Sequence, residues 1–167
     1  YWAINYIKRG IEKMKYVLEN ISGNYELMGG KGTALAKIGK AIDNIPEWFV
    51  VSYKGFDINE KIIKIEAENE IREKLKKFPE ETYFAIRSSA INEDSKENSF
   101  AGQFDTFLYI KKKDVIEKIK EVYMSAFSER IEIYRKENNI QEISIPSVIV
   151  QKMVESEKAG VAFGANP

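Results

Sequence analysis

The chain has 167 residues, of which 44% are hydrophobic and 31% charged, as is typical of a folded globular domain. Its 26 Lys and Arg residues balance 26 Asp and Glu residues, and a net charge of zero argues against a nucleic-acid-binding surface. The lack of Cys and His excludes disulfides and any His base, nucleophile or metal ligand. No apolar run approaches the roughly 18 to 20 residues of a membrane span, so we expect a cytoplasmic protein without a membrane partner.

Two helices and a strand are expected in the first third of the chain. The apolar spacing of residues 1–18 favours an amphipathic helix, with a short strand over residues 16–18 as the alternative. The glycine pair at positions 29 and 30 should break the chain before a helix over residues 31–42. The residues expected on the inward face of that helix are Ala34, Leu35, Ile38, Ala41 and Ile42. A short apolar strand follows over residues 48–52.

The rest of the chain combines charged helices with apolar strands. Helices are expected over residues 59–78, with Ile62, Ile65, Ile71 and Leu75 inward, and over residues 113–137, with Val115, Ile119, Val122, Ala126 and Phe127 inward. Strands are expected over residues 83–88, 106–110, 147–154 and 160–163, with a polar loop over residues 92–98. Because helices and strands do not alternate strictly, the sequence predicts an α+β fold rather than a doubly wound sheet.

The segment Gly29-Gly30-Lys31-Gly32-Thr33 precedes a predicted helix. Its glycines permit a close backbone approach, and the helix N-terminus adds partial positive charge, so Lys31 could reach a phosphate oxygen. The segment is not a Walker loop, because Gly32 stands where that pattern requires Ser or Thr after the lysine. An ordinary glycine turn with an exposed lysine is the alternative.

Arg87 leaves an apolar strand and is followed by Ser88 and Ser89. A guanidinium that emerges from a buried strand is unfavourable unless it is paired. It therefore binds an internal carboxylate, for example Asp94 or Asp105, or it awaits a ligand anion. The two serines either donate hydroxyl groups to that anion or cap the following turn.

Residues 99–106 form a candidate anion-binding loop with Ala101 and Gly102 at its tip. Its backbone N–H groups could lie over phosphates while Phe100 and Phe104 anchor its ends in the core. A plain hairpin turn with core phenylalanines is the alternative.

Residues 151–154 end the last long apolar strand. A strand that leads into a turn could offer backbone N–H and C=O groups to an adenine edge, with Met153 packed on the base. An ordinary core strand is the alternative.

Together these segments resemble the N-terminal nucleotide-binding domain of the phosphoenolpyruvate synthase and pyruvate phosphate dikinase family. Six matching pieces occur in the family's order between about Met14 and Pro167. They are Met28–Gly32, Ile45–Val51, Arg87–Ala90 with Glu93-Asp94, Ser99–Gln103 with Asp105–Phe107, Val150–Val154, and Ala159–Phe163 with Asn166-Pro167. Phe104 departs from the polar residue usual after Gln103, and Gly164-Ala165 departs from the usual Thr-containing pair.

The resemblance implies the N-terminal lobe of an ATP-grasp fold, a mixed or antiparallel sheet packed with helices that closes on ATP from one side. Carried over by motif, Lys31 and Arg87 hold ATP phosphates and offset charge that develops during transfer. The remaining nucleotide contacts implied by the resemblance are Ser88, Ala101, Gly102, Gln103 and Thr106 near the phosphates, and Gln151, Met153 and Val154 on the adenine side.

In such enzymes MgATP phosphorylates a histidine on a separate domain, and the phosphoryl group then passes to pyruvate on a third domain. The Mg²⁺ ligands, the phosphohistidine domain and the pyruvate-binding domain are expected beyond Pro167, so the chain alone is expected to be inactive. Residues 1–13 are a candidate upstream extension, and residues 14–167 are expected to be the N-terminal portion of the domain. Two alternatives stay open: a rifamycin-type antibiotic phosphotransferase and a stand-alone nucleotide-binding module without catalysis.

Overall fold

The computed structural model describes residues 16–19, 25–90, 104–138, 140 and 145–160. Its main sheet is antiparallel, with the strand order β1-β2-β7-β5-β6. These strands are β1 (Val17–Leu18), β2 (Trp48–Val51), β5 (Tyr83–Ser89), β6 (Thr106–Lys111) and β7 (Ser147–Lys152). A separate two-stranded ribbon pairs β3 (Phe56–Asp57) with β4 (Ile62–Ile63).

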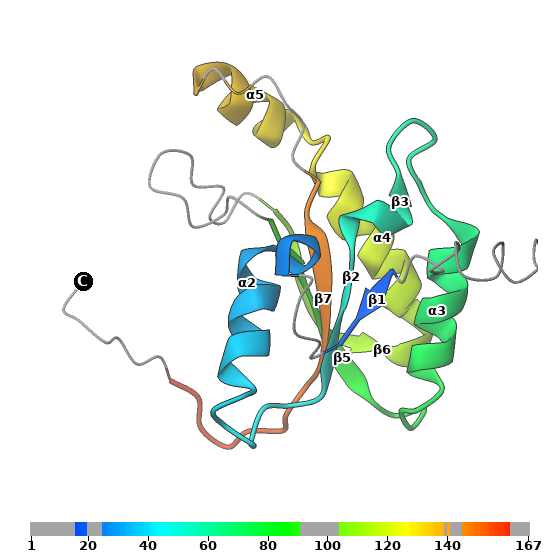
Figure 1. The fold of residues 1–167 in the computed structure, drawn as a ribbon, viewed down its shortest axis with the longest axis vertical. Coiled ribbons are helices and arrows are strands. Elements are labelled where there is room, and N and C mark those ends of the chain that lie inside the picture. The colour runs from blue at the N-terminus through cyan, green and yellow to red at the C-terminus, as the bar shows by residue number, and fades with distance from the viewer. Residues whose placement is uncertain (1–15, 20–24, 91–103, 139, 141–144, 161–167) are drawn as a thin grey trace, which may run out of the picture.

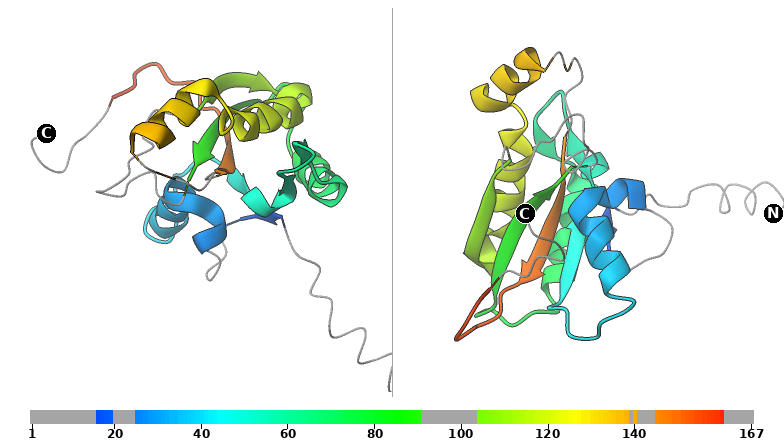
Figure 2. Two further views of the ribbon diagram at one scale, coloured as in Figure 1. Left: turned by 90° about the horizontal axis from the view of Figure 1, so that it is seen from above. Right: turned by 90° about the vertical axis from the view of Figure 1, so that its left-hand side faces the viewer.

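Helices cover both faces of the main sheet (Figure 1). Helix α2 (Tyr25–Ile38) lies on one side, and α3 (Ile65–Leu75) and α4 (Val115–Ser125) lie on the other. Figure 2 shows the same layers from two further directions, with α5 (Glu129–Glu137) following α4. Short 3₁₀ turns, η1 (Tyr53–Gly55) and η2 (Lys112–Asp114), precede β3 and α4. The predicted α+β class is confirmed.

The main hydrophobic core lies between the sheet and helices α3 and α4. Alternate side chains of the strands enter it, among them Phe49, Phe84 and Val150, each fully buried. Tyr123 of α4 is also fully buried, stacks on Phe56 at 4.6 Å and donates its hydroxyl hydrogen to the Ser52 carbonyl at 2.8 Å. A buried phenol with a hydrogen-bond acceptor is compatible with an apolar core.

The α2 side of the sheet has a smaller apolar cluster, formed by Leu18, Met28, Ala36, Val50 and Ile149. Its strand residues alternate with those that enter the main core. Helix α2 approaches the sheet closely, because a Cβ on Gly32 would lie 3.1 Å from the Val50 side chain.

Helix α2 corrects the prediction for residues 31–42. The helix begins at Tyr25 and ends at Ile38, with a kink at Gly29, whose φ is 69° and ψ 179°. The predicted inward face is only partly right: Leu35 packs against the cluster as expected, whereas Ile38 and Ile42 are 45% and 53% exposed. Small residues make the contact instead: Gly32 and Ala36 are buried, since a close approach to β2 leaves little room for larger side chains.

Two further helix predictions were too long. Ile62 and Ile63 pair with β3 as strand β4, after a turn in which the Asp57 carboxylate accepts the backbone N–H groups of Asn59 and Glu60. Consequently Ile62 and Ile65 are exposed rather than inward.

The predicted helix over residues 113–137 is also interrupted. It divides into α4 and α5 because Ser128 caps a new helix, its hydroxyl oxygen accepting the Ile131 N–H at 3.4 Å. The inward residues Val115, Ile119, Val122 and Ala126 are confirmed as buried, whereas Phe127 is half-buried.

The strand predictions over residues 48–52, 83–88, 106–110 and 147–154 are confirmed to within two residues. At the N-terminus, residues 17 and 18 form a strand, as the alternative interpretation expected. The predictions for residues 1–15, 92–98 and 161–163 lie outside the described residues. None of the helices in the described residues combines the length and apolar character needed to cross a bilayer.

Candidate functional site

The glycine turn of α2 is bound to the end of strand β5. The Gly30 N–H donates to the Ala90 carbonyl at 2.9 Å. A Cβ on Gly29 would lie 1.8 Å from the Ser89 carbonyl oxygen, and the positive φ of Gly29 already favours glycine. The segments Gly29–Gly32 and Arg87–Ala90, singled out separately in the sequence, are therefore one structural unit.

Two buried serines on neighbouring strands complete this unit. Ser89 of β5 and Ser147 of β7 are register partners. The Ser89 hydroxyl donates to the Met28 carbonyl at 2.7 Å and accepts the Gly32 N–H at 2.9 Å. The Ser147 hydroxyl donates to the Leu27 carbonyl at 2.7 Å. The resemblance assigned the nucleotide contact to Ser88 rather than Ser89, and Ser147 was not considered, although strand alternation places Ser89 on the same face as Arg87.

Arg87 is half-buried on the α2 side of the sheet. Its register partner on β7 is Ile149, which belongs to the α2 cluster, and paired strand residues point to the same face. No carboxylate in the described part of the chain forms an ion pair with Arg87. Asp105, one predicted partner, instead lies 3.7 Å from Arg130, and the other, Asp94, lies outside the described residues.

Lys31 is half-buried in the first turn after the kink of α2. It lies between Gly30 and Gly32, both of which are hydrogen-bonded to β5. The fold thus brings Lys31 and Arg87 to the same side of the sheet. Ser88 lies on the opposite side, because its register partner Val148 belongs to the main core.

The loop that follows β5 is described only at its C-terminal end. Ala101, Gly102 and Gln103 lie outside the described residues. Phe104 is buried among Ala90, Ala126 and Ile131, so the predicted aromatic anchor is confirmed at this position. Thr106 is exposed and is the register partner of Arg87 on β6, which places both side chains on one face.

In the segment Gln151–Val154, Gln151 lies on the same face as Arg87, because its register partner Ala85 is two residues before Arg87 on β5. Gln151 is half-buried between Ala85 and Trp48, its register partners on β5 and β2. The Met153 N–H donates to the Tyr83 carbonyl at 2.9 Å, so this backbone donor of the segment is already engaged.

A hollow of about 660 Å³ lies beside Met153 and Val154. The rings of Tyr83 and Tyr109 meet edge to face at its border, with centroids 6.4 Å apart. Tyr109 has a φ of 56°, at a register shift between β5 and β6. The hollow is open enough to admit a planar ring next to the thioether of Met153.

Comparison with known proteins identifies the family. A family model described as the AMP/ATP-binding domain of pyruvate phosphate dikinase matches residues 57–167. The chain belongs to the pyruvate phosphate dikinase and phosphoenolpyruvate synthase family. The described relatives include a probable phosphoenolpyruvate synthase of Pyrococcus horikoshii, which is 34% identical over 93% of this chain and 23% of that protein.

Two other relatives show the range of this family. The phosphoenolpyruvate synthase of Pyrococcus furiosus is 32% identical over 93% of this chain and 23% of that protein. An uncharacterized phosphotransferase of Bacillus subtilis, YvkC, is 32% identical over 85% of this chain and 20% of that protein. The chain therefore spans about a quarter or less of the length of these three relatives.

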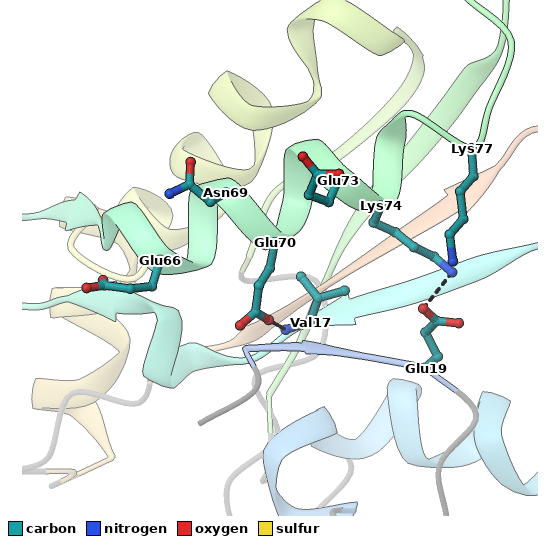
Figure 3. A pocket seen from close by; sticks show the side chains of 8 residues that line it. All are labelled: Val17, Glu19, Glu66, Asn69, Glu70, Glu73, Lys74 and Lys77. Carbon is teal, nitrogen blue, oxygen red and sulfur yellow. Dashed lines mark hydrogen bonds and ion pairs between the residues drawn. The ribbon is translucent and has the colours of Figure 1, made fainter. Parts of the chain in front are cut away.

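A second hollow, of about 610 Å³, lies between α3 and β1 (Figure 3). Glu70 points from α3 towards β1, where its carboxylate accepts the backbone N–H groups of Tyr16 and Val17, each at 2.9 Å. Lys74 forms an ion pair with Glu19 at 2.7 Å. These contacts join α3 to β1 and the residue that follows it. The hollow lies on the face of the sheet opposite to α2.

The described residues offer no metal centre. Within them, no group of three or more Asp and Glu side chains is arranged to hold an ion, and the chain has no His or Cys.

Proposed function

We propose that this chain forms the N-terminal lobe of an ATP-grasp module and binds MgATP in a phosphoenolpyruvate synthase-type dikinase. The antiparallel sheet packed between helices is compatible with such a lobe. The family description as an AMP/ATP-binding domain and the synthases among the relatives support the nucleotide and the enzyme class.

One observation carries the proposal: the glycine turn of α2 is bound to the end of β5, on the side of the sheet that Arg87 faces. Gly30, next to Lys31, is hydrogen-bonded to Ala90, and Ala90 lies three residues beyond Arg87. Three strand residues span roughly 10 Å, a separation that one triphosphate can bridge. Lys31 and Arg87 then contact neighbouring phosphates and offset charge in the transition state.

The same face offers a place for the base. Met153 lies four residues beyond Ile149, the register partner of Arg87, which corresponds to roughly 13 Å along the strand. This is the scale of an extended ATP molecule. The adenine then enters the hollow beside Met153 and Val154, with Val154 rather than Met153 as the backbone donor. Gln151 and Thr106 border the path, and Ala101, Gly102 and Gln103 lie over the phosphates.

The reaction proposed for the intact protein is transfer of a phosphoryl group from ATP to a histidine on another domain, and from there to pyruvate. Bound Mg²⁺ would neutralise phosphate charge, and its ligands are proposed to lie outside the described residues. The match to a Bacillus subtilis phosphotransferase supports a second candidate, in which the acceptor is another small molecule such as a rifamycin-type antibiotic. Both candidates use the same ATP site.

Calorimetric titration of the full-length gene product with MgATP tests the proposal. Arg87→Ala should weaken ATP binding about tenfold to a hundredfold, because a hydrogen bond to a charged group contributes about 1.5–3 kcal/mol. Lys31→Ala should weaken it about tenfold for the same reason. Lys113→Ala, an exposed lysine in η2, is the matched control and should bind as the unmodified protein does.

Wild-type affinity in both Arg87→Ala and Lys31→Ala would remove the proposed site. Incubation with ATP labelled at the β-phosphate, the group that remains on the acceptor when ATP is converted to AMP and phosphate, then separates the functions: label on histidine and pyruvate indicates the dikinase, and label on another acceptor indicates the second candidate. A protein that binds ATP but never acquires label is the non-catalytic module.

A further inference from the structure

Helix α2 is interrupted at Gly29, and backbone groups on both sides of the interruption bond to strand β5 instead of to each other. The Met28 carbonyl and the Gly32 N–H are four residues apart and would bond directly in a regular α-helix. Here the Ser89 hydroxyl stands between them, donating to Met28 at 2.7 Å and accepting from Gly32 at 2.9 Å. Both bonds are buried, and the serine comes from strand β5 rather than from the helix.

The bridging hydroxyl of Ser89 lies at the kink of α2. Side chains that enter the helical hydrogen-bond ladder are a recognised cause of sharp bends. The bend falls at Gly29, whose φ of 69° and ψ of 179° are accessible essentially to glycine alone. Before the bend, Leu27 is bonded to Ser147, so the preceding turn is also fixed to the sheet. The hydroxyl of Ser89 and the Ala90 carbonyl thus attach the first N–H groups of the second part of α2 to the end of β5.

The position of Lys31 follows from these contacts. Gly30 is bonded to Ala90 and Gly32 to Ser89, so both neighbours of Lys31 are attached to the end of β5. Arg87 lies two residues before Ser89 on the same strand and faces the same side. The distance between Lys31 and Arg87 therefore depends on the hydrogen bonds of the Ser89 hydroxyl, in which neither cation takes part.

We propose that Ser89 is a positioning residue for the ATP phosphates, holding Lys31 at a set distance from Arg87. The inference rests on the proposed function, which assigns ATP to those two cations. Without the hydroxyl, the Met28 carbonyl and the Gly32 N–H lose the bridge that attaches them to β5, and Lys31 shifts relative to Arg87. The fold survives this change, but the phosphate site is misplaced.

Calorimetric titration of the full-length protein with MgATP tests this role in Ser89→Ala. The dissociation constant should rise about tenfold or more, since small displacements of binding groups have effects of this size. The binding stoichiometry should stay unchanged, whereas a purely structural loss would lower the stoichiometry and leave the dissociation constant of the folded fraction as it was. Ser125→Ala is the matched control: Ser125 is also buried, donates one 2.7 Å bond to Val122 and lies in α4.

Wild-type affinity in Ser89→Ala, together with weakened binding in Lys31→Ala and Arg87→Ala, overturns the positioning role and leaves the ATP site standing. Wild-type affinity in all three variants overturns the proposed function itself. Should Ser89→Ala fail to fold, Ser89→Cys fills the position with a weakly hydrogen-bonding thiol. A raised dissociation constant in that variant supports the positioning role, and an unchanged one overturns it.

Discussion

The two faces of the sheet are built by different means. On the α3 and α4 side, a cluster of fifteen buried residues, mostly large and apolar, fills the space between the layers. On the α2 side, the apolar cluster has five buried residues, and the N-terminal part of the helix is attached through Gly30, Ser89 and Ser147. Apolar packing depends on volume and tolerates small shifts, whereas hydrogen bonds depend on distance and direction.

This difference indicates which face supplies stability and which supplies geometry. Burial of large side chains dominates the free energy of folding, so the α3 and α4 side should carry most of it. The α2 side has less apolar area to contribute, but its bonds fix individual backbone atoms of the glycine turn. A site that must place charges at set distances benefits from the second kind of contact.

The largest effect is expected at the glycine turn. Gly29→Ala adds a methyl group 1.8 Å from the Ser89 carbonyl oxygen at a φ of 69°. Because neither the strand backbone nor the conformation can accommodate it, the variant should lose about 4 kcal/mol or more of unfolding free energy. Urea denaturation measures the loss.

Gly160→Ala is the control for that variant, since Gly160 has no neighbouring atom within 4 Å of the added group. Its unfolding free energy should change by less than about 0.5 kcal/mol. Equal behaviour of the two glycine variants would show that the α2 attachment is not rigid and would break the comparison between the faces.

A somewhat smaller effect is expected in the main core. Ile71→Ala removes a fully buried side chain of α3 and should lower the unfolding free energy by about 3 kcal/mol, through lost burial and the cavity left behind. Ile65→Ala, on the same helix but 64% exposed, should change it by less than about 1 kcal/mol. The core variant should leave ATP affinity unchanged in the folded protein, and a large rise in its dissociation constant would contradict the division between the faces.

The smallest effect is expected for the hydroxyl of Tyr123. Tyr123→Phe removes one buried hydrogen bond to Ser52 while keeping the ring stacked on Phe56, so about 1 kcal/mol should be lost at pH 7. Urea denaturation at neutral pH checks this value. A loss as large as that of Ile71→Ala would mean that the core depends on polar contacts as well.

The same residue makes stability depend on alkaline pH. Burial raises the pKa of Tyr123 above its ordinary value of 10.0, so the folded protein keeps a proton that the unfolded chain releases. Its contribution is therefore fully present below pH 10 and is lost as the pH rises further, by about 1.4 kcal/mol per pH unit. The difference in unfolding free energy between the original protein and Tyr123→Phe should shrink and then reverse above pH 10.

The strands and the fold class could be predicted from the sequence because apolar runs such as residues 147–152 show little dependence on distant context. Helix boundaries were less predictable. Ile62 and Ile63 fit a helical spacing, yet they pair with Phe56 and Asp57 in a two-stranded ribbon. The local sequence around Ile62 does not identify that pairing partner. Ser128 was a capping signal that the apolar periodicity across residues 113–137 concealed.

The site shows the same limit. Lys31 and Arg87 stood out because glycines and a charge at the end of an apolar strand are unusual in sequence. That both residues lie on one side of the sheet becomes visible only from the pairing register of β5 with β7, which cannot be deduced from a local sequence pattern. The role of Ser89 could not be predicted because its partners, Met28 and Gly32, lie some sixty positions away along the chain.

The contact between Glu70 and β1 has a consequence for the behaviour of the protein at high concentration. β1 is the outermost strand on its side of the sheet, and an outermost strand normally exposes N–H groups that can recruit a strand from another molecule. The Glu70 carboxylate occupies the N–H groups of Tyr16 and Val17 and places negative charge beside them. We therefore expect Glu70 to disfavour aggregation by intermolecular strand addition.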